Sequence, residues 1–265
     1  MPGSSASPVT VTYVGGPTVL LEYAGLTILT DPTFDAPQEY ERPGSTTLVK
    51  THGPALDVAA LPPVHLILLS HHDHRDNLDE AGLALVRSGI PTLTTPLAAT
   101  ELGLPHVRGL EPWEATARRG FSVTAVPASH GPGDAAGPVT GFVLEAPGAP
   151  TVYVSGDNSE LDVVDEIAAR FAPIDVAVLF AGAARVPRID AALTLTSVDA
   201  VAATRMLGAR AVVGVHTEDW RHFSESRADL EAAFAAAGIA DLLVATPRGV
   251  RASVAEEPRS DVSGL

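Results

Sequence analysis

Apolar residues in this chain occur in short runs separated by glycine, proline and polar positions. In the first part, three β-rich runs divided by turn-forming glycines predict an antiparallel meander over residues 9–14, 18–23 and 26–30. The apolar run Leu66–Leu69 predicts a further buried strand. Beyond it, the pattern predicts helices over 78–88 and 97–102 and short strands over 92–94 and 114–117.

The second half changes from consecutive strands to an alternation of strands and helices. Strands are predicted over residues 121–126, 141–145 and 151–154. Helices over 161–171, 197–207 and 227–237 then alternate with strands over 176–180, 211–215 and 242–245. The segment Thr196–Asp199 (TSVD) resembles a capping box at the start of its helix. This order of elements predicts an α/β fold.

No linker or change of composition divides the chain, so we expect a single domain over residues 1–265 with a core from about 9 to 245. The polar tail, 256–265, is expected to be frayed. Residues 32–61 are irregular and rich in proline, glycine and threonine, as in loops that are functional or mobile. Charged residues of this loop, including Lys50, are expected to be solvated.

Polar residues crowd the segment His71–Asn77 (HHDHRDN), directly after the apolar run at 66–69. Three imidazoles and two carboxylates this close together would repel or compete with one another without a cation to share. Neutral imidazole and carboxylate are the usual ligands of first-row transition metals, with zinc the leading candidate. The alternative is a solvated loop rich in histidine. The spacing His72-x-His74-x-Asp76 at a strand end favours a metal site.

Three more strand ends carry side chains that can bind a metal. His130 follows the strand at 121–126, Asp157 follows the strand at 151–154, and His216 follows the strand at 211–215. Each signal alone is weak, because a histidine after a strand is more often structural and a Gly-Asp pair is more often a turn. Four such ends in one chain indicate a shared site in the loops at one edge of a packed sheet.

Composition narrows the chemistry further. The chain has no cysteine, which excludes disulfides, thiolate metal sites and cysteine nucleophiles. The net charge of −15 works against binding of DNA or RNA. Residues 1–8 lack a basic stretch and an apolar segment, and no run is long enough to span a membrane, so we expect a cytoplasmic protein.

These motifs together resemble the metallo-β-lactamase superfamily, whose signature is H-x-H-x-D-H followed by His, Asp and His at later strand ends. Within it, the chain is similar to the branch that contains ascorbate-6-phosphate lactonase and the phospholipase D acting on N-acyl phosphatidylethanolamine. The resemblance extends from about Val9 to Ala245 and includes Tyr13–Glu22 (YVGGPTVLLE), Leu29–Pro32 (LTDP), Gly141-Phe142 and Tyr153–Asp157 (YVSGD). It implies an αββα sandwich of two mixed β-sheets flanked by helices.

The resemblance also implies roles for the residues that match the signature. His72, His74 and His130 would hold one metal ion. Asp76 and His216 would hold a second, with Asp157 bridging the two. Asp76, Asp157 and His216 would carry the chemistry, with a hydroxide held between the ions as the nucleophile. The expected cofactor is zinc, as one or two ions, with manganese or iron as alternatives.

The chain departs from the family pattern at several positions. Asn77 replaces the last histidine of the signature, and its amide is a poorer zinc ligand, so the second ion is expected to be weak, exchangeable or absent. His71 is the alternative to His72, or supports a ligand, because Ser or Thr often precedes the first histidine. Gly16 stands where many relatives have histidine. Asp31 either orients a ligand histidine or caps a turn.

The expected activity is hydrolysis of a small-molecule ester, lactone or phosphodiester. Residues 220–223 (WRHF), just after His216, either line the substrate pocket or belong to the core. The alternative function is a degenerate, non-catalytic member of the superfamily that binds a metal or a metabolite. The sequence does not identify the substrate or the oligomeric state.

Overall fold

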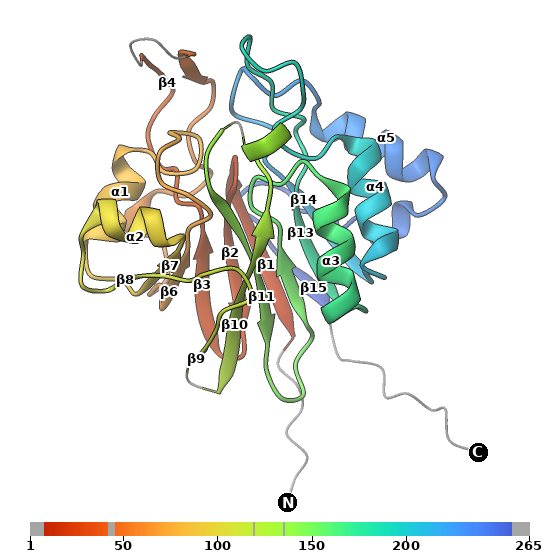
Figure 1. Cartoon of the computed structure of the whole chain (residues 1–265), viewed down its shortest axis with the longest axis horizontal. Coiled ribbons are helices and arrows are strands. Elements are labelled where there is room, and N and C mark those ends of the chain that lie inside the picture. Colours follow the sequence, from red (N-terminus) through yellow and green to blue (C-terminus); the bar gives the residue numbers. More distant parts are fainter. Residues whose placement is uncertain (1–7, 42–45, 119, 135, 256–265) are drawn as a thin grey trace, which may run out of the picture.

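Two β-sheets lie face to face, and helices cover the outer face of each sheet (Figure 1). The computed structural model describes residues 8–41, 46–118, 120–134 and 136–255, so the predicted frayed tail at 256–265 lies outside the described residues. Helices α1 and α2 lie on one side of the molecule and α3, α4 and α5 on the other (Figure 1). This four-layer arrangement confirms the predicted αββα sandwich.

The first sheet has the strand order β15-β1-β2-β3-β6-β7-β8. Its strands are β1 (Val9–Gly15), β2 (Thr18–Tyr23), β3 (Leu26–Thr30), β6 (Leu66–Leu68), β7 (Thr92–Thr94), β8 (Val107–Gly109) and β15 (Arg251–Ala255). β1, β2 and β3 form the predicted antiparallel meander, and β6, β7 and β8 add to it in parallel. The sheet is therefore mixed.

The second sheet has the order β14-β13-β12-β11-β10-β9 and is also mixed. Its strands are β9 (Ala115–Arg118), β10 (Phe121–Ala128), β11 (Val139–Glu145), β12 (Val152–Val154), β13 (Val176–Phe180) and β14 (Ala211–Val215). The pairs β9-β10, β10-β11 and β11-β12 are antiparallel, and the pairs β12-β13 and β13-β14 are parallel. Parallel strands end at the same edge of a sheet, so the residues after β12 and β14 lie near each other.

The helices of the described residues, except the third, begin at residues whose side chains cap the first turn. They are α1 (Glu80–Arg87), α2 (Pro96–Leu102), α3 (Leu161–Phe171), α4 (Ser197–Met206) and α5 (Arg227–Ala236), with 3-10 turns at Val58–Ala60, Pro132–Asp134 and Ala240–Leu242. Thr196 and Asp199 form the predicted capping box of α4, and Ser226 and Asp229 form another at α5. These bonds satisfy N–H groups that the first turn of a helix leaves free.

The core is divided by the alternation of side chains along each strand. Val176, Val178 and Phe180 of β13 belong to the cluster between the two sheets. Ala177 and Leu179, the residues between them, pack in the cluster beneath α3, α4 and α5. A third cluster lies between the first sheet and α1 and α2. Strands buried on both faces read as continuous apolar runs, which is why the sequence of β13 shows no polar residue.

Several features of the fold differ from the prediction, among them β8, which was not predicted. The strand predicted over 242–245 is wrong, because a 3-10 turn occupies 240–242 and Leu243 makes only an isolated bridge to Val212. The sheet extends past the predicted limit of about 245, since β15 pairs with β1. Finally, the irregular segment at 32–61 contains a short hairpin of β4 (Gln38–Tyr40) and β5 (Leu48–Lys50).

A buried ion pair attaches this hairpin to the sandwich. Lys50 Nζ lies 2.8 Å from Asp79 Oδ2, and both side chains are almost fully buried. The same carboxylate accepts a hydrogen bond from the N–H of Asp35 at 2.7 Å and caps α1 through the N–H of Gly82. Lys50 is thus not solvated as expected, and Asp79 fixes the hairpin relative to the loop that follows β6.

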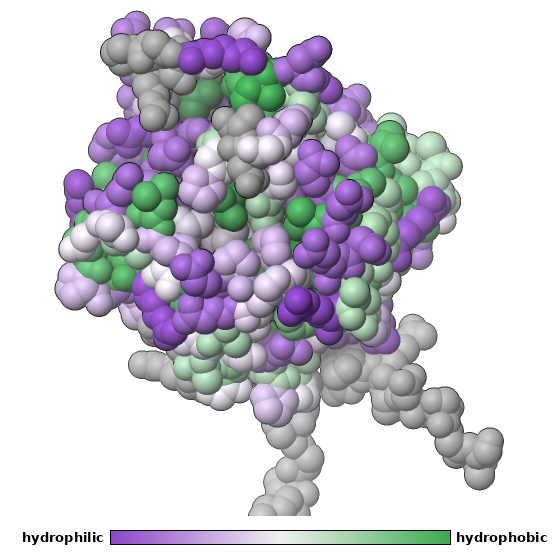
Figure 2. All heavy atoms as spheres, in the orientation of Figure 1, coloured by the Kyte–Doolittle hydropathy of each residue, from purple (hydrophilic) through white to green (hydrophobic). Residues whose placement is uncertain are grey.

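Hydrophilic residues are interspersed with small hydrophobic groups on the face shown in Figure 2. Large apolar side chains that are exposed are few among the described residues and scattered over different elements: Val58, Leu97, Val198 and Val250. Within the described residues, no helix is both long and apolar enough to cross a membrane.

The core between the sheets should dominate stability. Phe142 is 1% exposed at the centre of that core, so Phe142→Ala should lower the free energy of unfolding by about 3–5 kcal/mol in urea denaturation. Val198 is 71% exposed on α4, and Val198→Ala should change the free energy of unfolding by less than about 0.5 kcal/mol. Equal effects of the two substitutions would contradict this assignment of the core.

Candidate metal centre

Four loops that follow strands meet at one edge of the sandwich. They follow β6, β10, β12 and β14, and they bring seven polar residues together: Ser70, His71, His74, Asp76, His130, Asp157 and His216. The chain reaches this edge from both sheets, so residues far apart in the sequence become neighbours. The edge lies between the β4 hairpin and the loop after β13 at the top of Figure 1.

Three histidines form the first group. His71 Nε2 lies 2.9 Å from His74 Nδ1, and His130 Nε2 lies 3.3 Å from the same atom. The ligand atoms of this group all lie within 4.8 Å of one another. A second group with the same compactness consists of Asp76, Asp157 and His216.

Hydrogen bonds fix which ring nitrogen of two histidines faces the group. Ser70 Oγ donates to Asp31 Oδ1 at 2.8 Å and therefore accepts from His71 Nδ1 at 2.9 Å. His130 Nδ1 lies 2.7 Å from the carbonyl oxygen of Leu193 and must donate to it. Both rings therefore direct the lone pair of Nε2 at His74, which can donate only one proton through Nδ1. Lone pairs that converge in this way suit a shared cation.

Asp157 connects the two groups. Its Oδ2 atom lies 3.6 Å from His130 Nε2 and 4.0 Å from His71 Nε2. Its Oδ1 atom lies 3.5 Å from His216 Nε2, which is also 3.5 Å from Asp76 Oδ2. One carboxylate oxygen therefore faces each group, as a carboxylate that bridges two ions must do.

The donor set of these groups fits divalent cations. Asp157 Oδ2 and both ring nitrogens of His216 are buried without a hydrogen-bond partner among the described residues. Buried polar atoms are normally satisfied, and an ion is one explanation where they are not. Imidazole nitrogen and carboxylate oxygen together suit zinc, manganese or iron.

The buried surroundings also set the protonation states that such ligands need. Burial lowers the pKa of His71 well below its usual value, and His74 and His130 lower it further. Burial likewise lowers the pKa of His130. Burial opposes ionisation of Asp76, but His222 and His216 outweigh it and hold the pKa of that carboxyl well below its usual range. Neutral imidazoles beside an ionised carboxylate are ready to bind a cation.

The backbone is strained where His216 enters the site. Its φ angle of +58° lies in the left-handed region, which residues other than glycine seldom adopt. The N–H of His216 donates to the carbonyl oxygen of Gly16 at 2.8 Å. A Cβ atom at Gly182 would lie 2.0 Å from the carbonyl oxygen of His216, so glycine is required there. Such strain is concentrated at functional sites, where neighbouring contacts hold it in place.

A cavity of about 1050 Å³ opens above the two groups. His74, Asp76, His130 and His222 form part of its wall. Apolar side chains from several segments line the rest together with polar ones: Leu48, Leu83, Leu102, Val186, Ile189 and Leu193, with Arg75, Glu101 and Arg188. A volume of this order accommodates a small molecule beside the metal-ligand groups.

Comparison with known proteins identifies the family. The sequence model of the beta-lactamase superfamily domain matches residues 27–217. The chain belongs to the metallo-β-lactamase superfamily. An uncharacterized protein of Mycobacterium tuberculosis strain H37Rv is 30% identical over 192 residues, which cover 67% of this chain and 50% of that protein. The chain thus spans about half the length of the curated relatives that it matches.

Solved structures share the fold. The isothiocyanate hydrolase from Delia radicum gut bacteria has a TM-score of 0.81 and 23% identity, and the match covers 93% of this chain and 99% of that one. The diiron β-hydroxylase CmlA from Streptomyces venezuelae has a TM-score of 0.68 and 16% identity, and the match covers 96% of this chain and 55% of that one. The metallo-β-lactamase fold is therefore found in a protein named a hydrolase and in one named a diiron hydroxylase.

Within this superfamily fold, the histidine group contains His71 where the signature spacing led us to expect His72. His72 Nε2 instead lies 2.7 Å from Glu101 Oε2. The loop after β6 turns within the motif, so that the rings of residues 71 and 74, and not those of 72 and 74, lie together. His74, Asp76, His130, Asp157 and His216 all lie in the two groups.

Two further expected residues lie beside the groups. Asp31 accepts the N–H and the O–H of Ser70, at 2.7 and 2.8 Å, and so supports the serine that orients His71. Burial raises the pKa of Asp31 well above its usual value, and the two bonds from Ser70 oppose that rise. Asn77 donates to Asp157 Oδ1 at 3.2 Å and lies outside both groups.

A contact that the sequence did not single out is made by His222. Its Nε2 atom lies 2.9 Å from Asp76 Oδ2. The sequence offered this residue only as part of the pocket-or-core segment 220–223. No spacing rule relates it to Asp76, which is 146 positions away.

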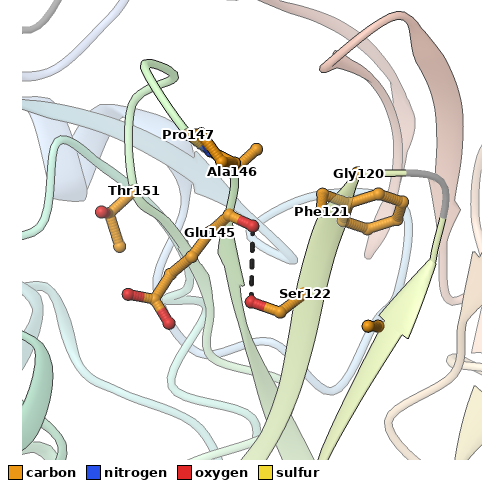
Figure 3. Close-up of a pocket in the computed structure, with 8 residues that line it drawn as sticks. Gly120, Phe121, Ser122, Glu145, Ala146, Pro147 and Thr151 are labelled. Atoms are coloured by element: carbon orange, nitrogen blue, oxygen red, sulfur yellow. Dashed lines mark hydrogen bonds between the residues drawn. The ribbon is translucent and has the colours of Figure 1, made fainter.

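A second hollow at the far end of the sandwich offers no comparable chemistry (Figure 3). It lies at the start of β10, whose other end leads to His130, and is lined by Phe121, Ser122, Glu145 and Thr151 among others. The hydroxyl of Ser122 donates to the carbonyl oxygen of Glu145 at 3.4 Å. No histidine lines it, so we assign it no site.

The geometry predicts different metal contents for variants of adjacent histidines. His71→Ala removes an imidazole from the histidine group and should lower its affinity for zinc by more than about 100-fold, above the usual effect of residues that only support a ligand. His72→Ala should leave zinc content unchanged, because that ring contacts Glu101. Elemental analysis after dialysis measures both, and zinc loss in His72→Ala alone would reverse the assignment.

Proposed function

We propose that this chain is a metal-dependent hydrolase of a small-molecule ester, lactone or phosphodiester. The observation that carries the proposal is the position of Asp157, with one carboxylate oxygen facing each ligand group beneath an open cavity. Zinc is the first choice of metal, and manganese and iron also suit the ligand set. The similarity of its motifs to the lactonase and phospholipase D branch supports this range of substrates.

His71, His74 and His130 would hold one cation, and Asp76, His216 and Asp157 the other. When bound, such cations polarise a scissile carbonyl or phosphoryl group and activate water as the nucleophile. The chain contributes the arrangement of these ligands. Ser70 and the carbonyl of Leu193 orient two of the imidazoles, so that their Nε2 atoms face inward before any ion arrives.

The cavity favours a small substrate over a polymer. Its volume is near the upper end of the range for ligand pockets, and its lining mixes apolar and polar side chains. The net charge of −15 works against a polyanionic substrate. Cytoplasmic location and the absence of nucleic-acid binding remain predictions.

A rival function is that of a non-catalytic member that binds a metabolite. Asn77 and Gly16, which replace histidines of the family pattern, motivate it. Two observations argue against it: both ligand groups are assembled, and the cavity reaches them.

Asp157→Asn separates the two functions. The neutral amide cannot supply the charge that holds two cations together, so turnover should fall by more than about 100-fold. The assay is a screen of lactones, carboxylic esters and phosphodiesters, to which we add an isothiocyanate because a structural neighbour is named an isothiocyanate hydrolase. Zinc, manganese and iron are each supplied.

Asp162→Asn is the matched control, since Asp162 is an exposed carboxylate on α3. Its turnover should equal that of the wild type. Wild-type activity that survives intact in Asp157→Asn would defeat the mechanism. A wild type without turnover on any substrate class, with every metal, would favour the non-catalytic function.

A further inference from the structure

We propose that His222 supplies the second imidazole of the Asp76–Asp157–His216 group, in place of the histidine that Asn77 replaces. The inference rests on the proposed metal-dependent function and adds a ligand to one of its two sites. It assigns this group four protein ligands: Asp76, Asp157, His216 and His222.

The first step is the convergence of two imidazoles on one carboxylate oxygen. His222 Nε2 lies 2.9 Å from Asp76 Oδ2, and His216 Nε2 lies 3.5 Å from the same atom. Of the two rings, His222 lines the cavity and His216 is fully buried. A cation that is bound by Asp76 and His216 lies within reach of the His222 ring.

The second step is that the amide nitrogen of Asn77 is committed elsewhere. Its amide lies 3.2 Å from Asp157 Oδ1 and 3.4 Å from Ser70 Oγ. An ionised carboxylate only accepts hydrogen bonds, so the Asn77 atom that faces Asp157 is the NH₂ group, which has no lone pair for a metal. This nitrogen therefore orients Asp157 and cannot take the coordination position of the family's histidine, while Asn77 Oδ1 is buried without a hydrogen-bond partner among the described residues.

The third step is that the fold holds His222 at this position. Its carbonyl oxygen accepts the N–H of Arg185 at 2.9 Å, and the neighbouring Phe223 forms a β-bridge with Ala184. Its ring packs against Phe223, with 4.7 Å between the ring centroids. The side chain is 10% exposed and lines the cavity. Asp76 is its one hydrogen-bond partner among the described residues, since Nδ1 has none.

The test compares zinc binding to the metal-free wild type and to five variants. Isothermal titration and elemental analysis should give two zinc ions per wild-type chain. In His222→Ala, the ion of the Asp76 group should bind more weakly by about 100-fold or more, and the ratio after dialysis should fall to one. Asn77→Ala should stay at two, because Asn77 is not a ligand in this arrangement.

His222→Gln and His72→Ala serve as controls. Glutamine can still donate a hydrogen bond to Asp76, so it should keep any structural contribution of that bond. The ratio of zinc to protein should nevertheless stay at one. His72→Ala removes a nearby imidazole that contacts Glu101 and should keep the ratio at two. Circular dichroism checks that each variant is folded.

Histidine side-chain NMR on the wild type tests the proposal without any variant, so it does not require a variant to fold. The Nε2 atom of His222 should lose its proton when the second equivalent of zinc binds. An Nε2 that keeps its proton in the two-zinc protein would overturn the proposal.

The outcomes separate this inference from the proposed function. Two ions in both the wild type and His222→Ala, with equal affinities, would overturn the role of His222 and leave the metal centre intact. One ion in the wild type, lost in His71→Ala, would also overturn it and leave only the histidine group. No zinc binding by the wild type would defeat the proposed function itself.

Discussion

Buried imidazoles and carboxylates that face one another at one edge of the sandwich are the constraint on which the rest of the site depends. His71, His130 and His216 direct ring nitrogens inward, and Asp157 directs one oxygen to each group. In a buried setting, such groups are costly unless each has a partner, and several here have none within the described residues. Divalent cations between them would satisfy these atoms together. Metal binding would therefore stabilise the fold as well as serve the chemistry.

The fold supplies this convergence through strand ends. The parallel strands β12, β13 and β14 end at the same edge, and the loop after β6 of the other sheet reaches the same place. Strain at His216 and the close approach at Gly182 are consequences of bringing the chain in so tightly. The buried pair Lys50–Asp79 then fixes the hairpin at the cavity relative to α1. The core, the loops and the hairpin thus together hold the metal-ligand side chains in place.

The sequence predicted the fold well because apolar periodicity and turn residues are local signals. It predicted the helix Leu161–Phe171 and the strand Val176–Phe180 with the bounds that the structure has. It missed β15, because pairing with β1 depends on a partner far away along the chain. The same reason explains the site: ligand types at strand ends are visible in sequence, whereas the choice of His71 over His72 depends on how a loop turns. His222 approaches Asp76 only through tertiary contact.

The central claim is that two adjacent cation sites share Asp157. Anomalous X-ray diffraction from crystals of the zinc-loaded protein tests it most directly, because it locates each ion independently of activity. The account predicts two peaks, one among His71, His74 and His130 and one beside Asp76 and His216, with Asp157 between them. Zinc-loaded crystals with no peak in either group, or with zinc bound only at surface histidines such as His72, would contradict it.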